Sequence, residues 1–257
     1  MQYRAAAWAG IATQFFWGAL QLLLFNAFYE SAGFNSPGAG YPMSFGQLAD
    51  FIWMRQAFLA LVMLWSMDNE LLEMIASGNV AYELLRPFSL YTFWFARILA
   101  YRISRTVMRC FPIFIIAFFL PGAWGFHPPN SLEAFILFVP SLVMAALLVT
   151  ALSMIICLVT FVSLNPNGAR LFIGVVGEFL MGALIPIPFM PPWLQRVTGF
   201  LPFRYTADFP FRVYSGHISG TEALAGLGIQ AFWLLAVICL GYFGFRASLK
   251  RLVVQGG

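Results

Sequence analysis

The sequence predicts an all-α protein that crosses a membrane several times, and two observations carry that prediction. Hydrophobic residues make up 61% of the 257 residues, charged residues make up 9%, and the mean hydropathy is +0.82. Soluble domains carry about 25% charged residues, so this chain has too little polar surface to face water over most of its area. Charge-free runs long enough to cross a bilayer also recur along the chain. This composition excludes a soluble enzyme, a nucleic-acid-binding protein and a disordered tail.

The chain divides into six candidate membrane-spanning helices within one domain of residues 1–257. Each is a largely apolar run bounded by charged or turn-forming residues, and about 20 apolar residues suffice to cross the hydrocarbon core. We expect the spans at about 5–28, 48–67, 97–120, 134–164, 170–186 and 222–246.

The sequence marks the first three spans with different clarity. The first is charge-free over residues 5–29, which exceeds the apolar region of about 7–15 residues in a signal peptide, so we expect a retained span. The second lies between Asp50 and Asp68. The third contains an uncharged run only at 110–120, so its helix is expected to begin nearer Arg97.

The last three spans follow from long uncharged stretches. The fourth is uncharged from Glu133 to Ala169, which is too long for one upright helix and predicts a tilted or Pro140-bent span. The fifth contains Glu178, and the sixth is charge-free over residues 223–245.

Arginine and lysine flank these spans unequally. With the N-terminus inside, ten basic residues lie on the cytoplasmic side, whereas Arg196, Arg204 and Arg212 lie outside. Because short cytoplasmic loops carry an excess of Lys and Arg, we expect both termini to face the cytoplasm.

The cytoplasmic connector, residues 68–94, is more elaborate than a loop between two spans. It starts with an amphipathic stretch, breaks at Ser77-Gly78-Asn79 and stops at Pro87, since glycine suits a helix C-terminus and proline ends a helix. We expect a short helix whose apolar residues fill a groove on a soluble partner while charged residues pair around the rim. The apolar set is Leu71, Leu72, Ile75, Tyr82 and Leu85, and the charged set is Glu70, Glu73, Glu83 and Arg86. A helix lying on lipid headgroups is the alternative, and its acidic residues oppose that because anionic lipids would repel them.

The outer segment, residues 186–220, begins with four prolines in seven residues. Proline fixes φ and removes a backbone donor, so residues 186–192 are expected to form a rigid non-helical elbow. The apolar pieces 193–201 and 209–214 are too short to cross a bilayer. Such segments enter a membrane only where protein or water satisfies their backbone groups, which predicts a partly re-entrant cap over the outer mouth of the bundle.

No enzyme or metal-site motif is present. A phosphate-binding P-loop needs a lysine before Ser or Thr, and the only lysine, Lys250, precedes Arg251. His127 and His217 lie on separate outer loops, so they do not form a zinc site on one helix. The three cysteines lack metal-ligand spacing and are expected to be small buried hydrophobic residues: Cys110, Cys157 and Cys239. We therefore assign no catalytic residue and no metal site.

Charged side chains inside spans are costly, at about 2.5–3.5 kcal/mol near mid-bilayer, so each needs a physical reason. Glu178 is the deepest, and it could contact a cationic substrate, relay protons or be the buried partner of an arginine. Arg55 lies near the outer end of its span, from which it can extend to the interface. Arg102, Arg105 and Arg109 fall within an arc of roughly 60° on one helix face. They could bind lipid phosphates, line an inner vestibule for an anionic substrate, or anchor the cytoplasmic end.

Several short motifs occur in an order that resembles one family. They are Gln2-Tyr3-Arg4-Ala5, Glu83-Leu84-Leu85-Arg86-Pro87-Phe88-Ser89, Pro191-Pro192-Trp193-Leu194, Leu201-Pro202-Phe203-Arg204-Tyr205 and Phe209-Pro210. Together they are similar to bacterial type-2 ATP-binding-cassette (ABC) transporter permeases of the small exporter branch, over essentially the whole chain. Family members commonly have a longer interfacial helix before the first span, where here about four residues precede it.

The resemblance implies a six-helix permease that moves an amphipathic small molecule, peptide or lipid-like substrate out of the cytoplasm. It implies two separate ABC ATPase subunits that bind ATP and Mg²⁺, a second permease, identical or related, and the bacterial cytoplasmic membrane. This chain would itself bind no cofactor. The residues that couple it to the ATPase would be Glu70, Glu73, Ile75, Asn79, Tyr82, Glu83, Leu85 and Arg86. The translocation pathway or external gate would include Arg55, Glu178, Pro188, Phe189, Trp193 and Phe203.

Two other function classes stay open from the residues alone. An ion-coupled secondary transporter needs an ion site, for which Glu178 is the one candidate. A membrane-embedded enzyme needs clustered catalytic residues, and the sequence shows none.

Overall fold

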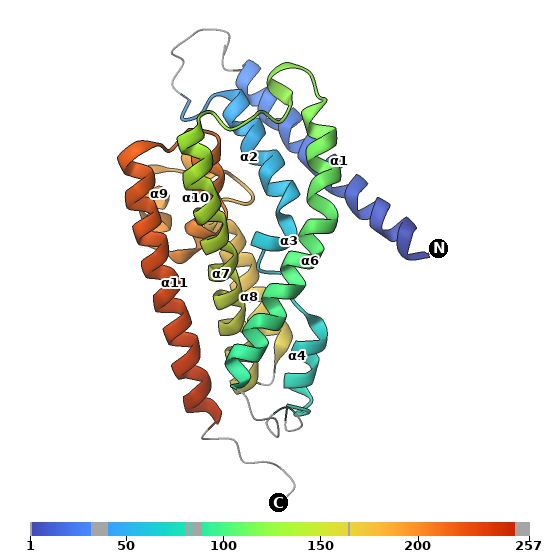
Figure 1. The fold of residues 1–257 in the computed structure, drawn as a ribbon, viewed down its shortest axis with the longest axis vertical. Coiled ribbons are helices and arrows are strands. Elements are labelled where there is room, and N and C mark those ends of the chain that lie inside the picture. The colour runs from blue at the N-terminus through green and yellow to red at the C-terminus, as the bar shows by residue number, and fades with distance from the viewer. Residues whose placement is uncertain (1, 32–40, 81–82, 84–88, 164, 250–257) are drawn as a thin grey trace, which may run out of the picture.

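The computed structural model describes residues 2–31, 41–80, 83, 89–163 and 165–249. Over these ranges every regular element is a helix, as the sequence predicts. The helices form an elongated bundle (Figure 1). One end carries α4 (Asn69–Ala76) and the C-terminal end of α11 (Gly220–Leu249), and the other carries the C-terminal end of α1 (Gln2–Ser31) and the short turn η1 (Gly122–Trp124).

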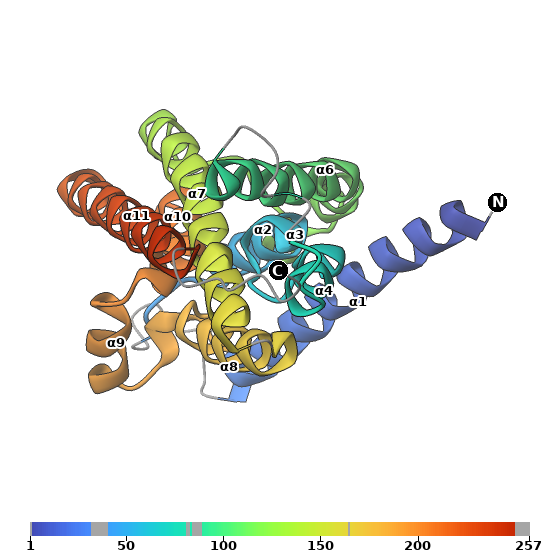
Figure 2. The same cartoon turned by 90° about the horizontal axis from the view of Figure 1, so that it is seen from below.

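Three helices in the described ranges are long and apolar enough to cross a membrane: α1 (Gln2–Ser31), α7 (Leu132–Ser163) and α11. α7 and α11 pack side by side (Figure 1 and Figure 2), and α7 also contacts most of the other helices. Pro140 lies inside α7 without ending it. The long uncharged run after Glu133 is therefore one helix of 32 residues that forms the centre of the bundle.

α1 leans away from the bundle, and its first turns project beyond the other helices in both views (Figure 1 and Figure 2). Its exposed large apolar side chains are Trp8, Phe16, Trp17, Leu20, Leu23, Leu24 and Phe28. The opposite face packs on α2 (Phe45–Ala57) at Gly18, where a Cβ atom would lie only 2.8 Å from the Trp53 ring. Glycine at this crossing lets the two helices approach closely.

The predicted span 48–67 is not one continuous helix. Ser44 and Gln47 form a capping box that starts α2. The helix ends at Ala57, a single turn named α3 (Leu59–Val62) follows, and residues 63–68 are non-helical. The stretch 51–67 contains neither glycine nor proline, so the local sequence does not explain the break.

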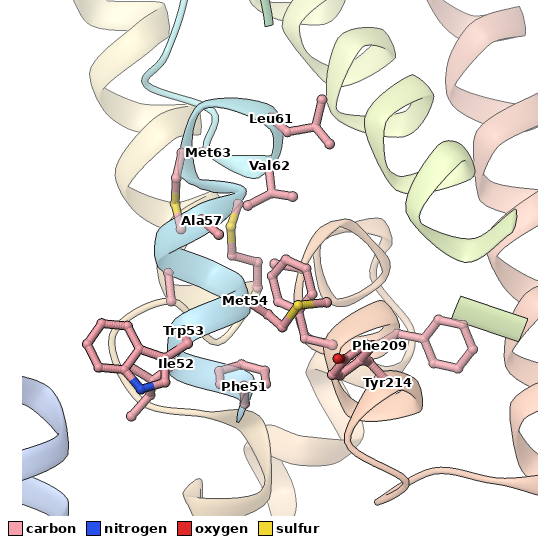
Figure 3. Packing of buried hydrophobic residues seen from close by; sticks show 14 of the residues in the cluster. Phe51, Ile52, Trp53, Met54, Ala57, Leu61, Val62, Met63, Phe209 and Tyr214 are labelled. Carbon is pink, nitrogen blue, oxygen red and sulfur yellow. The ribbon is translucent and has the colours of Figure 1, made fainter. Parts of the chain in front are cut away.

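The core of the bundle forms around α2, in which every residue from 48 to 57 is buried. Phe51 and Met54 face Phe209 and Tyr214 of α10 (Asp208–Tyr214), whereas Trp53 points to the opposite side (Figure 3). On that side Trp53 stacks on a phenylalanine of α1 with 5.3 Å between ring centroids. α2 thus joins α1 to the outer segment of the chain.

α6 (Leu90–Phe118) begins well before the predicted start near Arg97. The prediction counted uncharged residues, but arginine is a good helix former, and the helix continues through its basic half. At its other end a short turn, η1 (Gly122–Trp124), leads into α7.

α8 covers Pro166–Leu180 rather than the predicted 170–186. Asn165 caps its first turn, and Pro166 occupies the first helical position, where a missing N–H costs nothing. The helix ends just before Gly182, whose φ of +77° suits glycine.

Short helices follow α8 and fill the outer end of the bundle beside α7 and α11 (Figure 1). They are η2 (Ile187–Phe189), α9 (Pro192–Gly199), η3 (Pro202–Thr206) and α10. The proline-rich stretch 186–192 contains only the single turn η2, in agreement with the predicted elbow.

Candidate translocation pathway and coupling surface

One face of α8 lines a pocket of about 430 Å³. The lining residues of α8 recur three or four positions apart and so share one helix face: Asn167, Arg170, Leu171, Gly174, Val175 and Glu178. Trp65, from the non-helical segment 63–68, lines the other side. A Cβ atom at Gly174 would meet nothing within 4 Å, so the middle of the pocket is open.

The two ends of this pocket carry opposite charges. Arg170 lies near the N-terminus of α8 and Glu178 near its C-terminus, about 12 Å apart along the axis at 1.5 Å per residue. The helix dipole adds partial positive charge at the first end and partial negative charge at the second. Arg170 also donates a hydrogen bond of 2.8 Å from Nη1 to Asn69 Oδ1 of α4.

Glu178 lies between the pocket and the buried Arg55. Its Oε1 atom is buried and has no hydrogen-bond partner in the described structure, and the backbone N–H of Trp65 interacts with the carboxylate. Arg55 interacts electrostatically with Glu178, but no ion pair within 4.0 Å joins them among the described side chains.

The predicted extension of Arg55 to the outer interface is wrong. Its side chain is 4% exposed, and Nη2 donates a hydrogen bond to Gln21 Oε1 of α1. The polar side chain of Gln21 at the α1–α2 contact holds Arg55 inside the protein. Sequence reasoning missed this because the partner lies on another helix.

Close packing at Gly177 fixes the inner wall of the pocket. A Cβ atom there would lie 2.4 Å from Leu64 and 3.1 Å from Phe203. The non-helical segment 63–68 and η3 therefore both press against the α8 backbone. Phe203, expected at the pathway or gate, packs behind this wall and is not among the residues that line the pocket.

The helix α4, from the predicted cytoplasmic connector, has one buried and one exposed face. Leu71, Leu72 and Ile75 are at most 3% exposed and pack into a cluster with Trp94 of α6 and residues of α7. The expectation that these apolar side chains fill a groove on a partner is therefore wrong, since the protein's own bundle covers them. Glu73 is exposed on the other face, together with Glu70 and Asn79.

Polar contacts hold α4 firmly to the bundle. Asp68 caps its first turn and accepts a hydrogen bond of 2.7 Å from Arg97 Nε of α6. Glu83 accepts a hydrogen bond from Trp94 Nε1, so its carboxylate faces the bundle rather than a free rim. The other predicted coupling residues, Tyr82, Leu85 and Arg86, lie outside the described residues.

A comparison with known protein families shows to which family this chain belongs. The family model described as "ABC-2 type transporter" matches residues 2–209, most of the chain. The chain belongs to the ABC-2 type transporter family. No curated protein and no solved structure matches it.

Membership settles the general role of this ABC-2 permease. It is the membrane permease subunit of an ABC transporter and a multi-pass membrane protein. In this family the ATPase is a separate subunit, so this chain is not itself an enzyme, and the permease domain binds no cofactor.

Arg102 explains how the helical path can end after α3 inside the permease. The side chain is fully buried, and Nη1 lies 2.8 Å from the Met63 carbonyl and 3.3 Å from the carbonyls of Ala60 and Leu61. Nη2 donates to Ser153 Oγ at 2.8 Å. The last carbonyls of a helix lack intrahelical donors, and Arg102 supplies donors to them.

The prediction that Arg102 acts together with Arg105 and Arg109 at lipid or in a vestibule is wrong for Arg102. Arg105 is exposed, and its guanidinium stacks over Tyr101 at 4.8 Å from the ring centre. Arg109 is half-buried against α1, where its guanidinium would lie 3.4 Å from a Cβ atom at Gly10. The three arginines therefore have three different environments.

The structure separates the residues predicted for the outer gate. Phe189 joins an aromatic cluster with Phe25 and Tyr29 of α1, at centroid distances of 5.4 and 6.3 Å. Pro188 is half-buried beside it, whereas Trp193 is 66% exposed on α9. The aromatic contact joins the outer segment of the permease to the outer end of α1.

Sequence reasoning missed a buried charge cluster in the outer segment. Asp208 is fully buried and lies 3.1 Å from Arg212 and 3.5 Å from Arg204, each four residues away. Gln230 of α11 is also fully buried and donates to the carbonyls of Ser141 and Tyr205 at 2.9 Å. The i, i+4 spacing of Arg204, Asp208 and Arg212 is the one signal that could have revealed the cluster.

Proposed function

We propose that this permease exports an amphipathic small molecule, peptide or lipid-like substrate from the cytoplasm, powered by two ABC ATPase subunits. The α8 pocket is the observation that carries this proposal. It begins near the cytoplasmic α4 helix, follows α8 and ends at the half-buried Glu178, whose Oε1 atom has no hydrogen-bond partner in the described structure. A pocket lined by both polar and apolar side chains suits a substrate that has both polar and apolar groups.

The proposed topology has six spans with both termini in the cytoplasm of a bacterial cell, in its cytoplasmic membrane. α1, α6, α7 and α11 are four of the spans, and α2 with α3 is a broken fifth. α8 is too short alone, so the outer segment completes its path. A second permease, identical or related, and lipid would cover the exposed apolar faces of α1 and α8 outside the pocket, where Phe172 is 72% exposed.

ATPase coupling would run through the exposed face of α4. Glu70, Glu73 and Asn79 would contact the ATPase, and Tyr82, Leu85 and Arg86 remain proposed contacts. Because Asn69 of α4 accepts a hydrogen bond from Arg170, displacement of α4 would act directly on the pocket entrance. The cluster of Pro188 and Phe189 with α1, and the exposed Trp193, would form the outer gate.

Cysteine cross-linking tests the coupling assignment. Cys239 is the one exposed cysteine in the described structure and is first replaced by serine. Cysteines at Glu73 and Asn79 should then join to cysteines on the ATPase in at least one nucleotide state. A cysteine at Trp193, exposed at the opposite end of the permease, is the matched control and should not. Absence of cross-links from both Glu73, in α4, and Asn79, in the turn after it, in every state would refute the assignment.

Glu178 favours one second candidate, an ion-coupled secondary transporter. A half-buried carboxylate with one oxygen lacking a hydrogen-bond partner in the described structure can bind a proton or cation. Reconstitution separates the two: transport that needs the ATPase and ATP supports export as proposed, whereas transport driven by a proton gradient without them supports the alternative.

A further inference from the structure

We infer that the α8 pocket takes an amphipathic zwitterion, with a cationic group at Glu178 and an anionic group at Arg170, about 12 Å apart. This inference rests on the proposed function, because it names the substrate class of the same pocket. It specifies the sign of both charged groups of the substrate and the distance between them. The residues at the two ends of the pocket and between them are the evidence for each of these.

The inner end of the pocket suits a cation. Glu178 is half-buried and lines this end of the pocket. Its Oε1 atom has no hydrogen-bond partner in the described structure, so the carboxylate keeps capacity to accept from a cationic donor. The Trp65 side chain is 45% exposed and lines the pocket on the opposite side, where its ring can attract a cation. The C-terminal end of the α8 dipole adds partial negative charge at the same place.

The entrance of the pocket suits an anion. Arg170 uses Nη1 for Asn69, and its guanidinium has further N–H donors for a carboxylate or phosphate. Asn167 lines the pocket beside it. Both residues lie in the first turns of α8, where the helix dipole favours negative charge. No acidic side chain is among the residues that line this end.

Apolar side chains connect the two ends. Leu171 and Val175 lie between Arg170 and Glu178 on the same face and are 69% and 58% exposed. Gly174 leaves space between them. An alkyl chain fits this stretch, and burying it there removes apolar surface from water.

Chain length and charge can be varied in one series of probes. Extended ω-aminodecanoate places an ammonium and a carboxylate at about the required separation, whereas ω-aminohexanoate is too short to reach both residues. Decylamine and decanoate carry one charge each. Equilibrium binding of the four compounds is measured on the permease–ATPase complex in detergent, together with their stimulation of ATP hydrolysis.

The inference expects ω-aminodecanoate to bind at least tenfold more tightly than the other three, because it alone makes charge-assisted contacts with Glu178 and Arg170 at the same time. Glu178→Gln should remove its advantage over decanoate, and Arg170→Gln should remove its advantage over decylamine. Arg170→Lys should keep most of it. Glu133→Gln, an exposed position outside the pocket, is the matched control and should change nothing.

Equal binding of all four probes to the unmodified complex would overturn the inference, even if Glu178→Gln did not fold. So would a preference that neither pocket variant alters. The proposed function has a separate failure: binding of ω-aminodecanoate at Glu178 and Arg170 without any link to ATP hydrolysis would leave the pocket assignment standing and refute ATP-driven export. ATP hydrolysis that depends on α4 but does not respond to the charge of the probe would leave ATP-driven export standing and refute the pocket assignment.

Discussion

Replacing Arg102 by methionine should be among the most damaging single changes in this permease. Methionine keeps an unbranched side chain but is shorter and donates no hydrogen bond. Two contacts of the guanidinium are short, 2.8 Å to the Met63 carbonyl and 2.8 Å to Ser153 Oγ. Hydrogen bonds to charged groups contribute about 1.5–3 kcal/mol each. Their loss, together with two carbonyls at Ala60 and Leu61 left without this donor, predicts destabilisation of about 3–5 kcal/mol.

The assay compares Arg102→Met with Arg105→Met by thermal unfolding in detergent, followed by circular dichroism. Arg105 is exposed and stacks only on Tyr101, so its replacement should cost less than about 1 kcal/mol. Arg102→Lys keeps the charge with fewer donors and should fall between them. If Arg102→Met and Arg105→Met unfold at the same temperature, Arg102 does not stabilise the break after α3.

Three further predictions concern the outer half of the bundle. Gly226→Ala should destabilise the permease by about 1–3 kcal/mol, because the new Cβ atom would lie 2.1 Å from the Phe209 ring. Gly228→Ala is the control: its Cβ atom would meet nothing within 4 Å, so it should be neutral or stabilising in the same unfolding assay. Gln230→Leu should lower the unfolding temperature by removing two buried carbonyl contacts at a cost of about 1–3 kcal/mol for each group left unpaired. Burial, followed by the nearby Arg212, lowers the pKa of His217 from 6.5 to about 4. The folded state therefore favours the neutral ring, so stability should fall as the pH drops from 6.5 to 4, and His217→Gln should weaken that dependence.

The sequence predicted the features that follow from composition and spacing. Uncharged length identified α7 and α11, and the proline cluster identified the elbow before α9, because both depend on local properties. The start of α8 also had a local signal, Asn165 followed by Pro166, which a count of uncharged residues ignores.

Features that depend on contacts between distant residues could not be predicted. Nothing in residues 51–67 signals the end of the helical path after α3, because the stabilising group is Arg102, on α6. Ile75 is apolar on an amphipathic helix, and only the three-dimensional structure shows that the bundle itself covers that face. For the pocket, sequence reasoning identified Glu178 as a candidate but missed Arg170. Only the three-dimensional structure shows that both side chains line the same pocket.

ATP hydrolysis by the ATPase, reconstituted in liposomes with and without this permease, tests the central claim most directly. The claim is that the chain is the membrane half of an ATP-driven transporter, coupled through the exposed face of α4. We expect hydrolysis to change severalfold when the permease is present, and to return toward the ATPase-alone rate when Glu70 and Glu73 are both replaced by lysine. Hydrolysis that is the same with the permease, without it and with the double variant would contradict the account.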